Sequence, residues 1–116
     1  TGLVELGILK GNVDDLLAEK AYLPFYMHGS GHWLGLDVHD CGSYRQNGAW
    51  RELQPGMVLT VEPGLYFHPR LQQIDPKWSG MGIRIEDDIL VTEDGFENLT
   101  NALPADADAI EALIRD

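Results

Sequence analysis

The segment from His28 to Asp40 constrains the fold more than any other part of the 116-residue chain. It carries three of the four histidines, at positions 28, 32 and 39, and the sequence Gly-Ser-Gly separates the first two. On a helix, histidines four residues apart share one face, as in zinc proteases with an HExxH motif. Gly-Ser-Gly argues against a helix, and no glutamate follows His28. We therefore predict non-helical backbone whose glycines allow a close approach, or adopt a positive φ, beside a site.

Length and composition predict one globular, acidic domain. The hydrophobic fraction of 44% and the charged fraction of 23% fit such a fold. The net charge of −11 argues against nucleic acid or an anionic membrane as partner, because both bind clustered Lys and Arg. The acidity indicates a solvated surface or, for some carboxylates, cation binding. A single cysteine, Cys41, without a membrane-length apolar run or a signal-peptide pattern, predicts a cytoplasmic protein.

Helical periodicity is confined to the two ends of the chain. Apolar residues at three- and four-residue spacing predict helical structure over residues 1–20, interrupted at Gly7 and Gly11. Asn12 has the side chain and position of an N-cap for the second of two short helices. A closing helix is predicted over residues 103–115.

Between these helices, alternating apolar and polar residues predict strands. Residues 57–62 alternate, with Thr60 and Glu62 on one face. Residues 82–92 read as one strand whose aliphatic face is expected to be buried, and that face carries Ile83, Ile85, Ile89 and Val91. A short strand is predicted over 96–99, and loops over 40–48 and 68–82. The order of helix, strands and helix predicts an α+β fold with a mostly antiparallel sheet.

Glu62 and Glu86 are the carboxylates best placed to act with a histidine. Glu62 closes a strand that reads as buried, where a carboxylate is costly unless it is paired or bound to metal. Glu86 stands on a polar strand face, two residues from Arg84. If the two strands are neighbours, both carboxylates converge with an imidazole in a set that suits Mn²⁺, Co²⁺, Zn²⁺ or Fe²⁺. The alternative is an ion pair of either glutamate with Arg84 or Arg51.

Two details of the histidine segment need a geometric explanation. His32 and His39 are an odd number of residues apart, so a straight strand would point them to opposite faces. Both can serve one site only if the chain bends, and Gly35 is the expected bend.

Cys41 lies close to His39 but has no evident third partner, so we do not assign it as a nucleophile. The tryptophans are expected to form core or pocket wall rather than to stack on bases: Trp33, Trp50 and Trp78.

Three motifs in this order resemble the C-terminal half of the catalytic domain of the pita-bread metallopeptidases. They are His28-Gly-x-x-His32-x-x-Gly-x-x-x-His39-Asp40, then Leu-x-Pro-Gly-Met-Val-Leu-Thr-Val-Glu62-Pro-Gly-Leu-Tyr, then Gly82-Ile-Arg-Ile-Glu86-Asp-Asp. Within the family the chain most resembles Xaa-Pro aminopeptidase (aminopeptidase P), from about residue 3 to residue 113. The resemblance implies half of a pita-bread fold, with a mostly antiparallel curved sheet and flanking helices. Prolidase is the nearest relative in specificity, and a non-catalytic pita-bread binding module is the alternative from another class.

The resemblance also implies a site for two divalent metal ions, with Mn²⁺ expected. His32, Glu62 and Glu86 are its implied metal ligands, and Glu86 would bridge both ions. Glu62 would also help to move a proton. The implied reaction is hydrolysis of the first peptide bond of a peptide that has proline in second position, assisted by the two ions.

Three further residues receive roles from the resemblance. His28 and His39 are the implied catalytic histidines that contact substrate and stabilise the tetrahedral intermediate. Arg84 is the implied arginine that orients a carboxylate ligand.

The resemblance is incomplete in one respect. The family's two other metal ligands are aspartates on an upstream strand pair, whereas Asp14 and Asp15 are adjacent in a predicted helix. Residues 1–116 are therefore expected to form a single partial domain with the N-terminal half absent, and an incomplete dinuclear site. We expect little or no peptidase activity from this chain alone. Because one half of a pseudo-two-fold fold exposes apolar surface, we also expect a homo-oligomer that pairs through that surface.

Overall fold

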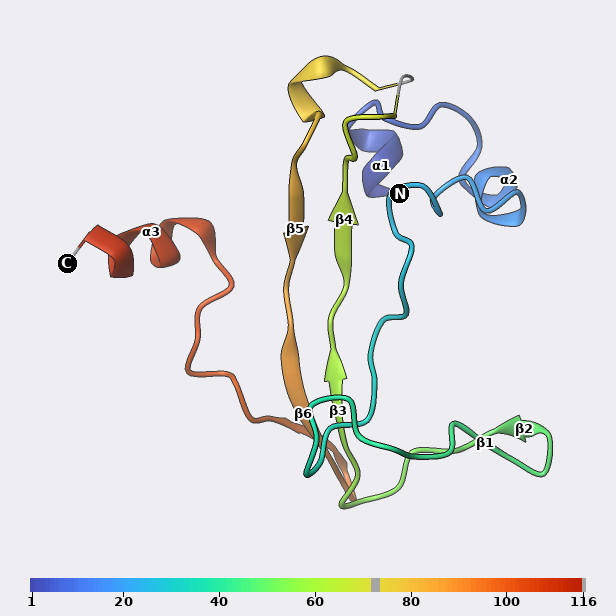
Figure 1. Cartoon of the computed structure of the whole chain (residues 1–116), viewed down its shortest axis with the longest axis vertical. Coiled ribbons are helices and arrows are strands. Elements are labelled where there is room, and N and C mark those ends of the chain that lie inside the picture. The colour runs from blue at the N-terminus through green and yellow to red at the C-terminus, as the bar shows by residue number, and fades with distance from the viewer. Residues whose placement is uncertain (72–73, 116) are drawn as a thin grey trace. The chain divides into compact units, whose positions relative to one another are not determined.

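The computed structural model describes residues 1–71 and 74–115 (Figure 1). The chain divides into two compact units, Thr1–His28 with Gly64–Arg84 and Gly29–Pro63 with Ile85–Asp116. The elements follow in the order α1 (Gly2–Glu5), α2 (Val13–Ala18), β1 (Arg45–Gln46), β2 (Ala49–Trp50), β3 (Val58–Val61), β4 (Gly64–Tyr66), the 3-10 helix η1 (Pro76–Trp78), β5 (Gly82–Arg84), β6 (Asp87–Thr92), β7 (Gly95–Asn98) and α3 (Ala107–Arg115). Every strand pairing among the described residues is antiparallel, which confirms the predicted α+β class.

Two short helices begin the first unit, as the periodicity predicts. After α1 the chain passes through Gly7, whose φ of 71° lies in the left-handed region that favours glycine. The side chain of Asn12 accepts hydrogen bonds from the N–H groups of Asp14 at 2.8 Å and Asp15 at 3.4 Å. The predicted N-cap of α2 is therefore confirmed.

A small aromatic core holds the first unit together. β4 and β5 pair antiparallel, with Gly64 opposite Arg84. Phe25 and Phe67 are each only 5% exposed, and their ring centroids lie 5.7 Å apart. The ring of Trp78 lies 5.7 Å from that of Phe67 and completes the cluster. Trp78 is thus a packing residue, as expected.

The predicted loop over 68–82 contains one turn of regular structure, η1. The carboxylate of Asp75 caps it by accepting the N–H of Lys77 at 3.0 Å. This hydrogen bond, with the nearby Lys77 charge, lowers the pKa of Asp75 below its ordinary value. Residues 72–73 of the predicted loop lie outside the described residues.

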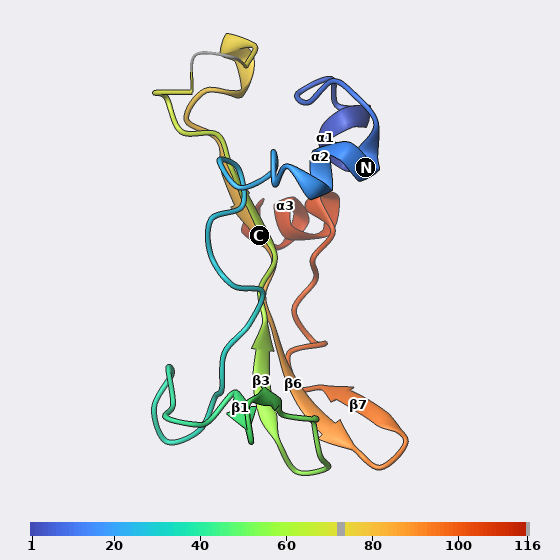
Figure 2. The same ribbon diagram turned by 90° about the vertical axis from the view of Figure 1, so that its right-hand side faces the viewer.

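The second unit is built on a three-stranded sheet in the order β3-β6-β7 (Figure 2). The central strand β6 pairs with β3, where Val58 lies opposite Leu90, and with β7, where Thr92 lies opposite Gly95. Gly95 has a φ of 152°, a backbone conformation that favours glycine, and it follows the turn between β6 and β7. The predicted strands over 57–62 and 96–99 are confirmed within one residue at each end.

The single strand predicted over 82–92 is wrong in one respect, because it is divided into β5 and β6. The division falls at Ile85 and Glu86, and the N–H of Ile85 donates to the carbonyl of Pro63 at 3.2 Å. Pro63 has no N–H with which to return a hydrogen bond, so the regular ladder is interrupted here.

The expected burial of the aliphatic face is confirmed in part. Ile89 and Val91 in β6 are half-buried. The expectation is wrong for Ile83 and Ile85, which are 64% and 45% exposed. Burial of a sheet face needs a second layer, and the described residues do not place one over these two side chains.

The predicted loop over 40–48 gives way to a hairpin formed by β1 and β2. Its turn residues Asn47 and Gly48 have φ values of 54° and 82°. Positive φ at both central positions is the signature of a type I′ turn, which Asn-Gly strongly favours. The sequence therefore carried this signal, and the loop prediction missed it. The Arg45 guanidinium lies over the Trp50 ring at 4.4 Å, a cation–π contact.

The closing helix α3 begins later than its periodicity predicts. Residues 103–106 precede it, and the Asp106 side chain accepts the N–H of Ala109 at 3.0 Å, which is an N-cap contact. Its apolar side chains are exposed, with Leu113 at 66% and Ile114 at 78%. Among the described residues, no helix has both the length and the apolar character that crossing a membrane requires.

Candidate metal centre

The centre is built where the histidine segment lies along β3. The N–H groups of Thr60 and Glu62 donate to the carbonyls of His32 and Ser30 at 2.9 and 2.8 Å. Trp33 forms an antiparallel bridge with Leu59. Residues 30–34 therefore act as a further strand beside β3. This pairing fixes the position of His32 along β3 and so its register relative to Glu62.

Gly31 makes this approach possible. A Cβ at this position would lie 2.0 Å from the carbonyl oxygen of Thr60, far inside any real contact. Only glycine lets the two backbones come so close. The expectation that glycines between the histidines serve a close approach is confirmed at this residue.

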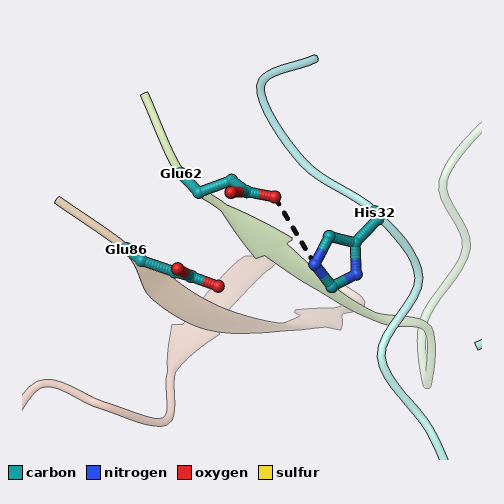
Figure 3. Close-up of side chains that lie close together, drawn as sticks. All are labelled: His32, Glu62 and Glu86. Atoms are coloured by element: carbon teal, nitrogen blue, oxygen red, sulfur yellow. Dashed lines mark ion pairs between the residues drawn. The ribbon is translucent and has the colours of Figure 1, made fainter. Parts of the chain in front are cut away.

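Glu62 and Glu86 come together because their strands are paired. In the register of β3 and β6, Val61 lies opposite Asp87, so the next position places Glu62 opposite Glu86. One ligand atom from each of Glu62, Glu86 and His32 can be chosen so that all three lie within 4.8 Å of one another (Figure 3). Three predicted ligands, distant in sequence, thus converge in the second unit.

The imidazole of His32 is oriented for ligation. Its Nδ1 lies 2.9 Å from the carbonyl oxygen of Trp33. A carbonyl only accepts hydrogen bonds, so Nδ1 carries the proton in the neutral ring and Nε2 keeps its lone pair. A backbone carbonyl is one of the usual partners of the second ring nitrogen in a metal-binding histidine.

The spacing of the donors fits a metal ion. His32 Nε2 lies 3.4 Å from Glu62 Oε1, and the two side chains are each 16% exposed. Two donors about 2.1 Å from one ion, at an angle of about 105°, are separated by about 3.3 Å. The same distance also allows a His–Glu ion pair when the imidazole is protonated. The third donor, Glu86, adds a second carboxylate within 4.8 Å, and a divalent cation would offset the repulsion between the two carboxylates.

His39 lies against His32, as the expected bend requires. Their ring centroids are 4.4 Å apart. The chain reverses between them, with the N–H of Asp40 donating to the carbonyl of Trp33 at 3.1 Å. Gly35 lies at the start of this bend, and a Cβ there would lie 1.8 Å from the Asp40 carboxylate, so a larger residue would displace that side chain. The predicted bend at Gly35 is confirmed.

The other two predicted site residues belong to the first unit. The Nε2 atom of His28 lies 2.9 Å from the hydroxyl oxygen of Tyr66, and the two rings meet edge to face. Arg84 is in β5, opposite Gly64. The structure therefore brings together His32, His39 and the two glutamates, and places His28 and Arg84 in a separate compact unit.

An aromatic cavity of about 250 Å³ adjoins His32. Trp33 and Tyr44 stack along one side of it, with ring centroids 5.5 Å apart, and Trp50 also lines it. The expectation that Trp33 and Trp50 form pocket wall is confirmed. Cys41 is exposed, and its N–H donates to the Asp40 carboxylate at 2.9 Å.

Sequence reasoning did not select Thr60 as a site residue. Its hydroxyl accepts the N–H of His32 at 3.1 Å and lies 3.4 Å from Glu62 Oε1. The alternation that puts Thr60 and Glu62 on one face of the strand was the available signal.

The model of metallopeptidase family M24 matches residues 4–93 of the chain. The chain belongs to this family. Among curated relatives, the Xaa-Pro aminopeptidases of Escherichia coli and Haemophilus influenzae are 58% and 54% identical over 98% and 97% of this chain. The M24 chain spans only about a quarter of their length, 25% and 26%.

Solved structures similar to this chain are also aminopeptidases P. Pseudomonas aeruginosa aminopeptidase PepP is 56% identical, with a TM-score of 0.94 over 98% of this chain and 26% of that one. Escherichia coli aminopeptidase P with the inhibitor Pro-Leu is 59% identical, with a TM-score of 0.88 over 97% and 25%. The resemblance to aminopeptidase P and to half of a pita-bread fold is thereby confirmed.

Proposed function

We propose that this M24 chain supplies three metal ligands to the catalytic centre of an Xaa-Pro aminopeptidase, which releases the N-terminal residue of a peptide when proline is second. The observation that carries the proposal is the convergence of His32, Glu62 and Glu86. The names of the relatives support this specificity over that of prolidase. Retention of the whole triad argues against a non-catalytic binding module.

The proposed chemistry assigns each side chain of the centre a task. Divalent ions bound there supply Lewis-acid polarisation of the scissile carbonyl and activation of water. His32, Glu62 and Glu86 would hold the ions. Glu62 also takes and returns a proton, since its carboxylate borders the space that the ligands enclose. His39 donates a hydrogen bond to the carbonyl oxygen as negative charge develops on it.

The remaining roles extend the same proposal. His28 contacts the substrate, and Arg84 orients a carboxylate ligand. We propose Mn²⁺ as the metal, because two carboxylates and one imidazole form a mostly oxygen-rich set. Three ligands do not complete a dinuclear site, so we propose that residues 1–116 form part of a catalytic domain.

Metal titration with matched variants tests the centre. Isothermal titration should give a Mn²⁺ site in the 116-residue chain that Glu86→Gln or His32→Ala weakens at least tenfold. The control is Glu97→Gln, because Glu97 is an exposed glutamate of β7 in the same unit. Equal weakening by Glu86→Gln and Glu97→Gln would show that general acidity, rather than the centre, attracts the ion.

Peptide hydrolysis tests the extent of the catalytic domain. With Mn²⁺ and an Xaa-Pro tripeptide, the 116-residue chain should show little turnover, because the second ion lacks its other ligands. Robust turnover would contradict the proposed partial domain. A chain that cleaves only Xaa-Pro dipeptides would indicate prolidase specificity instead.

We also propose that the chain self-associates in a cytoplasmic setting. The exposed aliphatic side chains of Ile83 and Ile85 favour association. Cys41 is an exposed free thiol, which suits a reducing compartment. Light scattering that gives a monomer at all concentrations would contradict the homo-oligomer.

A further inference from the structure

We infer that Thr60 is a positioning residue of the metal centre, whose hydroxyl ties the backbone of His32 to the carboxylate of Glu62. The inference rests on the proposed metal-binding function. It adds a residue that neither binds the ion nor contacts substrate, and that acts by setting the separation of two ligands.

Because Thr60 is buried, its polar groups form their hydrogen bonds within the protein. Thr60 is 2% exposed and is the most deeply buried polar residue among those described. Its Oγ1 accepts the N–H of His32 at 3.1 Å, and its own N–H donates to the carbonyl of His32 at 2.9 Å. His32 is therefore held by Thr60 at both of its backbone polar groups.

The direction of the hydrogen bonds links this anchor to the carboxylate. A hydroxyl has one proton to donate and can accept as well. Because Thr60 Oγ1 accepts from His32, its proton is available to donate, and Glu62 Oε1 lies 3.4 Å away. An ionised carboxylate only accepts, so the proton of this contact comes from Thr60.

The same carboxylate oxygen faces the ligand atom of His32. Glu62 Oε1 lies 3.4 Å from Thr60 Oγ1 and 3.4 Å from His32 Nε2. Thr60 thus limits rotation of the Glu62 carboxylate while fixing the backbone that carries the imidazole. Because threonine is β-branched, its χ1 is restricted on a strand and its hydroxyl is held in place.

Thr60 is 2% exposed, so its hydroxyl meets neighbouring protein groups rather than bulk water. The Gly31 backbone packs so closely on Thr60 that a Cβ there would lie 2.0 Å from the Thr60 carbonyl oxygen. A water molecule needs space and two or more polar partners. Loss of the hydroxyl should therefore deprive the N–H of His32 of its side-chain partner.

The test compares Thr60→Val, which keeps the shape and removes the hydroxyl, with Thr60→Ser, which keeps the hydroxyl. Thr92→Val is the matched control, since Thr92 is a half-buried threonine at the other end of the sheet. Titration of the 116-residue chain with Mn²⁺ should show about a 10–100-fold loss of affinity for Thr60→Val. Thr60→Ser and Thr92→Val should stay within about threefold of the parent.

A second readout needs no metal. Amide hydrogen exchange at His32 should be faster in Thr60→Val than in the parent, and close to the parent in Thr60→Ser, because exchange reports the lost hydrogen bond. If circular dichroism shows that Thr60→Val has lost its sheet, Thr60→Ala takes its place, because the smaller side chain removes the hydroxyl without adding an apolar methyl.

The outcomes separate this inference from the proposed function. Absence of Mn²⁺ binding by the parent chain contradicts the proposed function, whatever the exchange data show. Unchanged affinity and exchange in Thr60→Val overturn the positioning role. Equal losses in Thr60→Val and Thr60→Ser also overturn it, because the hydroxyl then does not matter.

Discussion

Gly31→Ala is the substitution that most sharply tests how the metal centre is assembled. The added Cβ would lie 2.0 Å from the Thr60 carbonyl oxygen, and 3.2 Å from its carbonyl carbon. A carbon–oxygen contact normally relaxes at about 3.3 Å, so residues 30–34 must move from β3 by about 1.3 Å. Backbone rather than a flexible side chain blocks the methyl group, so no rotamer change relieves the clash.

The cost follows from the hydrogen bonds that such a movement breaks. Three backbone bonds join this segment to β3, with lengths of 2.8, 2.9 and 3.1 Å. A net contribution of about 1 kcal/mol from each gives about 3 kcal/mol for loss of the pairing. That corresponds to roughly a hundredfold shift toward the detached segment. Because His32 moves with the segment while Glu62 does not, Mn²⁺ affinity should fall with it.

Amide exchange measures this opening directly. The N–H groups of Thr60 and Glu62 donate to the segment, so Gly31→Ala should speed their exchange about a hundredfold. Gly29→Ala is the control, since a Cβ there would meet its nearest atom at an ordinary 3.9 Å. If the two variants exchange alike and bind Mn²⁺ alike, the close approach at Gly31 does not build the centre.

Two further predictions concern the first unit. Asn12→Ala should destabilise α2 by about 1 kcal/mol, because the N–H groups of Asp14 and Asp15 lose their cap, and circular dichroism during urea unfolding checks this. The carboxyl of Asp75 should titrate by NMR below the ordinary 3.8, because the N–H of Lys77 stabilises its charged form. Since the folded-state pKa is lowered, the associated stabilisation is present at neutral pH and is lost as the pH falls through that lowered pKa. A midpoint above 3.8 would contradict the cap.

The sequence predicted the parts of the fold that local chemistry decides. Asn12 capped a helix because its side chain satisfies N–H groups two and three residues away. Alternation predicted β3 and β6, and the family resemblance implied that Glu62 and Glu86 share one site. The Asn47-Gly48 turn was also local, and its hairpin signal was overlooked.

What the sequence could not predict depends on contacts between distant segments. Pairing of Gly31 with Thr60 sets the position of His32, and no local pattern reports it. The division of the long strand depends on Pro63 lying opposite Ile85. The exposure of Ile85, at 45%, depends on which layers cover the sheet, and alternation alone only tells which face is apolar.

The central claim is that His32, Glu62 and Glu86 hold one divalent ion together. X-ray absorption of the chain loaded with one equivalent of Co²⁺ tests it most directly, because imidazole scattering is distinct from that of carboxylates. We predict one imidazole nitrogen at about 2.1 Å in a shell otherwise made of oxygens, and loss of the imidazole signal in His32→Ala. An all-oxygen shell in the parent chain, or an unchanged imidazole signal in His32→Ala, would contradict the claim.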